Sequence, residues 1–459
     1  MEQRDLSWEI AEFFAENRYE KLPQSAIDGA KKSIIDTLGV CLAASGKEPA
    51  VRAMVDFVQH SGGRPESSVL AFGGRVPAIM AAFANGAMSH CLDYDDQTPW
   101  GQHSASTLLP AVFAVSERQG GMTGKRMIAA VAAGQDLFNR LRRNVDWQKD
   151  WNFSTVMGVF CATAASGYLL DLTKEQIAQA LGIASMQSCG TMEVIYSTGS
   201  DMRAMYAGFP AKGAVLAALL AERNISGVPA VLEGRHGILT MYFGGRYERD
   251  KILDGLGHDY TGGLTLYKRW PAVGTAHSHI HATVELVTEH DLRLNDIAEI
   301  RVYVGDYHQI MCEPIEVRRV PKTLVDAKFS LPFLVSVAAV HRDMRLSDFT
   351  EEGIHDPEVL AAAQKVIPIV DSSLDWKLEL PPGRVEIVTK DGRRFERVGT
   401  DIPGSAANPM SWDDIFRKFT DCAEASINPW SAKQIDRAKD MALRLEEFED
   451  ATELLRLGS

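Results

Sequence analysis

The sequence has few cysteines, and no apolar run is long enough to cross a membrane. Its six cysteines are scattered over 459 residues without a Cys-x-x-Cys pair, so free thiols are expected rather than a disulfide framework. No apolar run approaches the roughly 18 residues of a membrane span. The charged start, MEQRDLSWEI, lacks the apolar core of a signal peptide. These absences predict a cytoplasmic protein.

Positive charge is also scarce, because 48 Lys and Arg face 61 Asp and Glu for a net charge of −13. Binding to nucleic acid or to anionic lipids relies on basic surfaces, so we expect neither a nucleic-acid partner nor a membrane partner. The sequence also lacks the glycine-rich phosphate loops GxGxxG and GxxxxGK[ST] and the GxSxG elbow. Nucleotide-dependent chemistry and ordinary serine-hydrolase chemistry therefore lack their signatures.

The composition is otherwise that of a globular protein, with 46% apolar and 24% charged residues. At roughly 150 residues per domain, the length predicts two to three domains. Apolar residues recur at helical spacing in six stretches of the first 267 residues. These predicted helices are Ile27–Leu42, Pro77–His90, Thr107–Arg118, Lys125–Arg140, Val156–Leu170 and Ala211–Glu222. Abundant Ala and Gly in them predict closely packed helices.

The pattern changes near Lys268. Ile297–Gly305 alternates apolar and polar residues, which predicts a half-buried strand. Lys390-Asp391-Gly392 predicts a hairpin between strands at Val385–Thr389 and Arg393–Val398. Between these strands the spacing predicts two helices, Phe329–His341 and Asp356–Lys365. This middle segment is typical of a small α+β domain.

After Pro403 the pattern is helical again, over Trp412–Ala423 and Ala432–Leu455. The fold class predicted is therefore mainly α. A large all-helical domain is formed from both chain ends, residues 1–267 and 403–459. A smaller α+β lid domain covers residues 268–402.

An acidic cluster follows the helix predicted to end near His90. Asp93, Asp95 and Asp96 lie within four residues, and His103 follows in the next loop. One interpretation is a site that offers carboxylates and an imidazole for proton transfer. A capped helix end is the alternative, although negative charge there opposes the helix dipole. A calcium loop of EF-hand type is excluded, because Gly at position six and Glu at position twelve are missing.

A second cluster joins Lys268 and Arg269 to three alternating histidines, His277, His279 and His281. On a helix, the first and third histidines would share a face and the second would point away. No HExxH or CxxC partner accompanies them, so no metal site is predicted. An anion-binding patch of Lys268, Arg269 and His277 and an ordinary domain-boundary turn are the two interpretations left.

A third candidate is Arg203, in the nearly uncharged stretch Ser200–Gly208. A guanidinium can clamp a carboxylate through two parallel hydrogen bonds. Pairing of Arg203 with Asp201 or with a helix end is the simpler alternative.

Short motifs occur in a fixed order along almost the whole chain. They are Asp36–Gly39, Ala82–Gly86, His90 with Leu92–Asp96, Ala207–Phe209, Leu232–Gly234, Tyr267-Lys268 before Pro271, Ala327–Pro332, and Asn408–Ser411 before Lys418-Phe419. Together they resemble the MmgE/PrpD family, which includes 2-methylcitrate dehydratase, cis-aconitate decarboxylase and iminodisuccinate epimerase. The resemblance implies a helical domain with an α+β lid, a homodimer, a site between the domains, and neither metal nor organic cofactor. It places Asp93, His103, Lys268 and His277 at active-site positions.

The sequence departs from the family pattern at several of these positions. Gln97 stands where Thr is often found, and Phe153 aligns with a histidine implicated in the decarboxylase. Arg203 replaces a common Lys, and Tyr206 replaces the histidine that follows it. Phe333 stands where the lid motif often has Tyr, which removes a hydroxyl. Part of the proton-transfer equipment of the family is therefore expected to be missing.

The resemblance implies a cofactor-independent lyase that moves a proton next to a carboxylate of a small di- or tricarboxylic acid. His103 would transfer protons, because its pKa lies near neutrality, and Asp93 would orient it or act as a base. Lys268 and Arg203 would form a small basic cleft that holds the anionic substrate. Further substrate contacts are expected from His277, Gln97 and Tyr206. An isomerase or epimerase of a substituted succinate is the alternative, which Phe153 favours, and a non-catalytic binding protein is the third.

Overall fold

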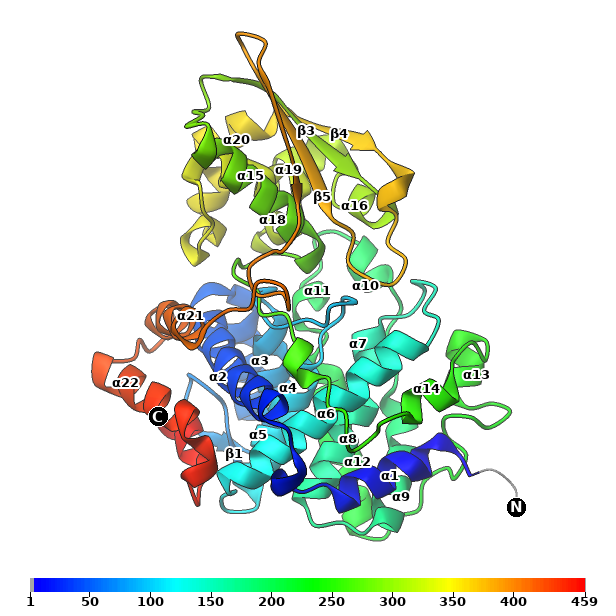
Figure 1. Cartoon of the computed structure of the whole chain (residues 1–459). Coiled ribbons are helices and arrows are strands. Elements are labelled where there is room, and N and C mark those ends of the chain that lie inside the picture. The colour runs from blue at the N-terminus through cyan, green and yellow to red at the C-terminus, as the bar shows by residue number, and fades with distance from the viewer. Residues whose placement is uncertain (1–3, 459) are drawn as a thin grey trace.

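Two sets of helices, from opposite ends of the chain, form the lower part of the molecule in Figure 1. The computed structural model describes residues 4–458. The first set comprises α1 (Leu6–Glu16), α2 (Gln24–Lys47), α3 (Pro49–His60), α4 (Ala78–His90), α5 (Ala105–Arg118), α6 (Gly124–Asn144), α7 (Phe153–Val156), α8 (Gly158–Leu169), α9 (Lys174–Ala184), α10 (Glu193–Tyr196), α11 (Met202–Met205), α12 (Gly208–Glu222), α13 (Ile238–Phe243) and α14 (Arg249–Leu253). The second set is α21 (Trp412–Glu424) and α22 (Ala432–Leu443), which pack against α2. A small hairpin, β1 (Ser67–Ser68) with β2 (Arg75–Val76), completes this part.

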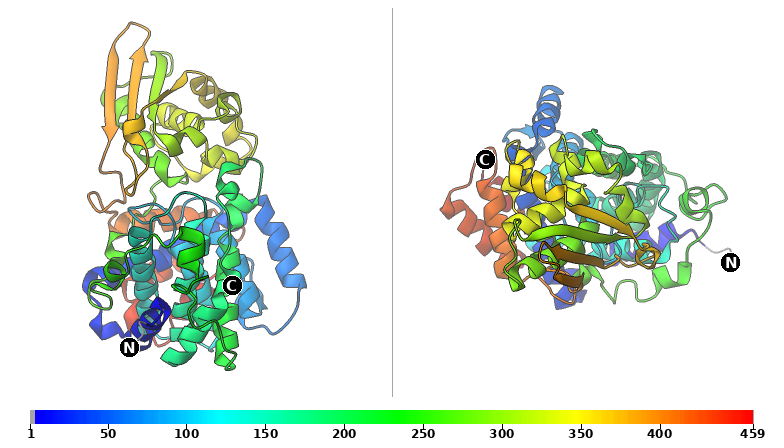
Figure 2. Two further views of the ribbon diagram at one scale, coloured as in Figure 1. Left: turned by 90° about the vertical axis from the view of Figure 1, so that its right-hand side faces the viewer. Right: turned by 90° about the horizontal axis from the view of Figure 1, so that it is seen from above.

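The upper part contains a four-stranded sheet and the helices that cover it (Figures 1 and 2). Its elements are α15 (His277–Glu289), β3 (Ile297–Val304), α16 (Asp306–Ile310), α17 (Ile315–Arg319), α18 (Leu324–Lys328), α19 (Leu331–His341), α20 (Pro357–Ala363), β4 (Val366–Val370), β5 (Gly383–Thr389) and β6 (Arg394–Gly399). The strand order is β4-β3-β5-β6, with β3 parallel to β4 and the other pairs antiparallel. All these elements lie within the range 268–402 predicted for the lid. The mainly α fold is confirmed.

The helices at the centre of the lower part are buried because they are apolar on every side. All twelve residues of α8 are buried. Helices α5 and α12 pack against α8, and α4 packs against both α5 and α12. Small residues allow the close approach. A Cβ atom at Gly86 of α4 would lie 2.8 Å from the Cα of Gly208 in α12. The predicted close packing of Ala- and Gly-rich helices is therefore confirmed at this contact.

The sheet follows the predicted alternation. Ile297, Ile300, Val302 and Val304 of β3 are buried against the lid helices, and Val302 lies opposite Val385 of β5. The predicted hairpin joins β5 and β6, and its turn lies at the end of the lid farthest from the helical part (Figure 2).

Two features differ from the sequence prediction. Strand β4 was missed, because it is a short edge strand interrupted by Pro368, a residue that cannot donate to a sheet. The predicted last helix is too long, since α22 ends at Leu443 and two short 3-10 segments follow. Asp450 begins the second of these segments, because its carboxylate accepts hydrogen bonds from the backbone of Thr452 and Met122.

Among residues 4–458, no helix combines the length and apolar character required to cross a bilayer. All six cysteines carry free thiols, as expected, and Cys189 is the one that is exposed.

Candidate active site

A small cavity of about 40 Å³ lies where the helical part meets the lid. The helical part contributes His90, Asp93, Gln97, His103, Asn152 and Tyr206 to its wall, and the lid segment contributes Thr275, Tyr307, Phe329 and Trp376. The wall thus mixes titratable, amide and aromatic side chains. Four of the seven residues predicted for the site, Asp93, Gln97, His103 and Tyr206, line this cavity directly.

The backbone after α4 determines where the three carboxylates point. The chain turns back at Asp93, which has a φ of +50° and whose N–H donates to the carbonyl of His90 at 2.8 Å. Asp is one of the residues that tolerate this left-handed conformation. The turn directs Asp93, Asp95 and Asp96 inward, and all three are buried. The carboxylates therefore face the interior of the protein and not the solvent at the end of α4.

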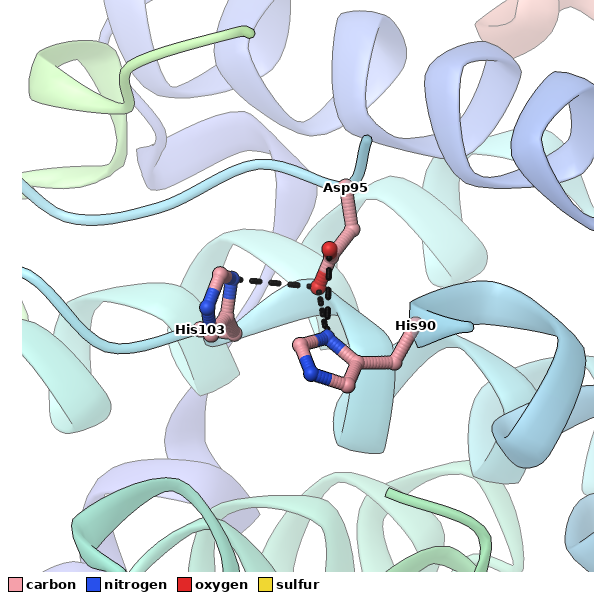
Figure 3. A group of neighbouring side chains, drawn as sticks. All are labelled: His90, Asp95 and His103. Atoms are coloured by element: carbon pink, nitrogen blue, oxygen red, sulfur yellow. Dashed lines mark hydrogen bonds and ion pairs between the residues drawn. The ribbon is translucent and has the colours of Figure 1, made fainter. Parts of the chain in front are cut away.

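Asp95 lies between two imidazoles (Figure 3). Its Oδ2 accepts from His90 Nδ1 at 3.0 Å and lies 3.1 Å from His103 Nδ1. The second imidazole also donates from Nδ1 to the carbonyl of Asp96 at 2.7 Å. Because carboxylate and carbonyl oxygens can only accept, both rings carry a proton on Nδ1. This leaves Nε2 of each ring as the atom available to a ligand in the cavity.

Electrostatics favour an ion pair within this group. Burial alone would raise the pKa of the Asp95 carboxyl, but the charges of His103 and His90 outweigh it and hold the pKa well below its usual range. Burial would lower the pKa of His103, but the charge of Asp95 outweighs burial and the pKa is raised. Asp96 differs, since burial together with Asp95 and Asp36 raises its pKa to about 7. Asp95, rather than Asp93, is therefore the residue that orients His103.

Asp93 pairs with Lys268, which is fully buried. The Lys268 ammonium contacts the Asp93 carboxylate, donates to its carbonyl oxygen at 2.9 Å and lies 3.9 Å from Asp95 Oδ1. Burial would raise the pKa of Asp93, but Lys268 and then the two histidines outweigh it, and the pKa is lowered. Lys268 thus lies behind Asp93. The predicted anion-binding patch is wrong, because Arg269 turns toward Asp343 on the surface.

Arg203 lies behind another part of the wall. Its side chain is 2% exposed, and its guanidinium carbon is 3.3 Å from the ring centre of Phe329, which lines the cavity. One nitrogen donates to the carbonyl of Ser197 at 3.4 Å, and Nε has no hydrogen-bond partner among the described residues. Burial lowers its pKa to about 10, so the group remains charged at neutral pH. The alternative pairing with Asp201 is not formed, whereas the alternative pairing with a helix end is, since Ser197 is the C-cap of α10.

The remaining predicted contacts divide into two groups. Gln97 and Tyr206 line the cavity, and the buried Nε2 of Gln97 has no partner among residues 4–458. His277 is buried outside the cavity wall, with its ring 5.4 Å from that of Trp270. Burial and then Lys268 lower its pKa to about 3, so it is neutral. His279, as predicted, points elsewhere, with its Nε2 2.8 Å from the carbonyl oxygen of Tyr303.

Several cavity residues were not among the predicted site residues. His90, which lines the cavity, and Asp95, which lies behind it, belonged to a motif, but the sequence did not say which acid would meet which imidazole. Asn152 lines the cavity beside Phe153, which packs into the core against Phe138 and Phe243. A lid hydroxyl comes from Tyr307, for which the sequence gave no signal.

Within residues 4–458, one group has the donor types of a metal site. Among the described residues, ligand atoms of His90, Asp95 and His103 lie within 4.8 Å of one another. A zinc ion would require bonds of about 2.0–2.2 Å and loss of both Nδ1 protons. It would also face the ammonium of Lys268, 3.9 Å from Asp95. The donor set therefore fits a hydrogen-bonded imidazole–carboxylate group better than a divalent ion.

Comparison with known proteins gives matches along nearly the whole chain. The MmgE/PrpD N-terminal domain model matches residues 8–250, and the MmgE/PrpD C-terminal domain model matches residues 270–444. A cis-aconitate decarboxylase of Aspergillus terreus is 28% identical, with 98% of this chain and 95% of the relative covered. The human cis-aconitate decarboxylase is 24% identical, with 95% and 91% covered. A mitochondrial 2-methylcitrate dehydratase of Yarrowia lipolytica is 23% identical, with 82% and 76% covered.

The order of motifs, the helical part with its α+β lid and the matches to both family domains agree with one another. The chain belongs to the MmgE/PrpD family and is an enzyme of the MmgE/PrpD type.

Proposed function

We propose that this enzyme is a lyase that acts on a small di- or tricarboxylic acid by moving a proton next to a carboxylate, without a cofactor. The observation that carries the proposal is the pair of imidazoles on Asp95, both of which line one small cavity. The names of the relatives supply the reaction class, since decarboxylation and dehydration are both lyase reactions. Both reactions place negative charge next to a carboxylate, which a site must stabilise.

The two imidazoles suit one acid and one base. Their ring centres are 4.7 Å apart, and the single charge of Asp95 balances one imidazolium. His103 is the acid, because Asp95 favours its charged form. His90 is the base, through the lone pair of Nε2. In a dehydration, His90 takes the proton from carbon and His103 protonates the departing hydroxyl. In a decarboxylation, the C–C bond breaks, CO2 leaves, and His103 protonates the carbon.

Charge balance in the wall favours an anionic substrate. Asp93 is balanced by Lys268 and Asp95 by His103, so Arg203 remains as a buried cation without a carboxylate partner among the described residues. A substrate carboxylate would supply the missing negative charge. The unpaired amide of Gln97 provides a further hydrogen-bond donor, and Tyr206 packs its ring 4.4 Å from that of His90. His277 lies outside the wall, so it would not contact the substrate directly.

The test is a set of incubations followed by NMR, with cis-aconitate, 2-methylcitrate and an epimer pair of a substituted succinate. The lyase proposal predicts loss of CO2 or of water from one of the first two acids. His103→Asn should abolish the reaction, whereas Asp136→Asn, at a buried carboxylate of α6 outside the cavity, should retain it. Solvent deuterium uptake without loss of mass would make the enzyme an isomerase. Binding without turnover of any acid would indicate a non-catalytic protein.

A homodimer and a cytoplasmic location are part of the same proposal, supported by the family resemblance and by composition. Light scattering coupled to size-exclusion chromatography should give twice the chain mass of 50.4 kDa. A monomeric mass with full activity would contradict the dimer.

A further inference from the structure

Three buried lysines from three distant segments converge on the loop that carries the active-site carboxylates. Lys328 donates to the carbonyl oxygen of Cys91 at 3.1 Å, Lys268 to that of Asp93 at 2.9 Å and Lys418 to that of Tyr94 at 2.6 Å. The loop is thus held by an ammonium group at three of four successive residues. Lys268 contacts Asp93 itself, but Lys328 and Lys418 do not line the cavity.

Each of these two outer lysines has a carboxylate partner of its own. Lys328 pairs with Glu48, which lies between α2 and α3, and Lys418 pairs with Asp36 of α2 at 2.7 Å. All four side chains are at most 6% exposed. A buried ion pair is balanced only while both partners are present, so these pairs fix the lysines in place. Their ammonium groups then have hydrogen bonds left for the loop carbonyls.

The loop needs such anchors. It follows the end of α4, where helix carbonyls have no helical partner, and cationic side chains are favoured there. Asp93 also takes the left-handed conformation, which few L-residues adopt. Lys328 belongs to α18 of the lid, whereas Glu48 and Cys91 belong to the helical part, so this lysine also joins the two sides of the cavity.

We propose that Lys328 and Lys418 are positioning residues, which hold the Cys91–Tyr94 backbone so that Asp93 meets Lys268 and Asp95 meets both imidazoles. The proposal rests on the proposed function of the site. A displacement of about 1 Å in a catalytic group can reduce turnover about 100-fold, so anchors outside the wall matter for rate.

A single and a double variant separate the effect of losing the backbone contact from the effect of leaving a buried charge unpaired. Lys418→Met leaves Asp36 as a buried unpaired charge and should lower both stability and kcat. The double variant Asp36→Asn with Lys418→Met removes both charges, so the melting temperature should recover toward wild type. The Tyr94 carbonyl still lacks its donor, so kcat should stay about 100-fold low with KM changed far less. Lys328→Met with Glu48→Gln should behave in the same way.

Lys31→Met is the matched control. Lys31 also donates to a backbone carbonyl, that of Leu443 at 2.5 Å, and pairs with Glu446 at 2.7 Å, but it contacts no residue of the loop. This variant should lose stability while kcat stays at the wild-type value.

A second readout needs no substrate. In protein labelled with ¹⁵N-histidine, the imidazole of His103 is identified by its absence in His103→Asn. Asp95 raises the pKa of His103, so a displaced loop should move the titration of this imidazole to lower pH in both double variants. If no acid is turned over, the proposed function fails while this titration still tests positioning. Double variants with wild-type kcat, or with an unmoved titration of His103, would overturn the proposal.

Discussion

Replacing Asp95 with Asn should show what the shared carboxylate contributes to catalysis. Asp95 is fully buried and binds Nδ1 of both His90 and His103. Hydrogen bonds to a charged group contribute about 1.5–3 kcal/mol each, so two of them amount to roughly 3–6 kcal/mol. Each 1.36 kcal/mol is tenfold in rate, so a loss of about 10²- to 10⁴-fold in kcat is expected. An amide oxygen can accept from one ring, while the amide N–H groups then face the other.

The pH dependence makes the same prediction sharper. His103 acts as an acid only while it is protonated, so kcat/KM of the wild type should fall as pH rises through its raised pKa, above 6.5. In Asp95→Asn the charge that favours the imidazolium is gone, so the fall of kcat/KM with rising pH, the alkaline limb of the profile, should move to lower pH. Steady-state kinetics between pH 5 and 9 measure both effects. A kcat within tenfold of wild type together with an unmoved limb would refute the role of Asp95.

Asp136→Asn is the control for this substitution. Asp136 is also a fully buried carboxylate, but it pairs with Arg140 at 2.7 Å and accepts from Thr261. Its loss should lower the melting temperature and leave kcat and the pH profile unchanged.

Three further predictions concern the residues in and behind the cavity wall. Lys268→Met should reduce kcat at least ~100-fold in folded protein, because Asp93 is left unpaired and negative charge is no longer balanced beside Asp95; near-normal kcat would contradict this. Arg203→Met should raise KM by up to about tenfold, less than the loss of a direct charge-assisted hydrogen bond would, because the guanidinium lies behind the ring of Phe329; an unchanged KM would exclude Arg203 from substrate binding. Activity should survive exhaustive chelation, and loss of activity that zinc restores would turn the His90–Asp95–His103 group into a metal site.

Much of the fold could be predicted because its signals are local. The helical spacing in Pro77–His90 and the alternation in Ile297–Gly305 correspond to α4 and β3 within one or two residues. Strand β4 could not be predicted from its own residues, because it is defined by its pairing with β3. Ile300 of β3 lies opposite Val366 of β4, 66 residues later in the sequence. The short segment that replaces the predicted last turns depends on Asp450, whose carboxylate accepts from the backbone of Met122, 328 residues away.

The site was predicted to the level of segments and not of contacts. Three acids in four residues identified the loop after α4, but the backbone turn at Asp93 decides that this acid meets Lys268 while Asp95 meets the imidazoles. Lys418 stood in a recognised motif, yet its contact with the Tyr94 carbonyl spans 324 residues of sequence. Such contacts require the folded chain, because no local spacing encodes them.

Product analysis in D2O tests the central claim most directly. The enzyme is incubated with cis-aconitate or 2-methylcitrate in D2O, and the products are followed by NMR and mass spectrometry. The account predicts loss of CO2 with one deuterium bound to carbon, or loss of water, and neither product should form with His103→Asn. Exchange of deuterium into an intact acid, or turnover by His103→Asn at the wild-type rate, would contradict it.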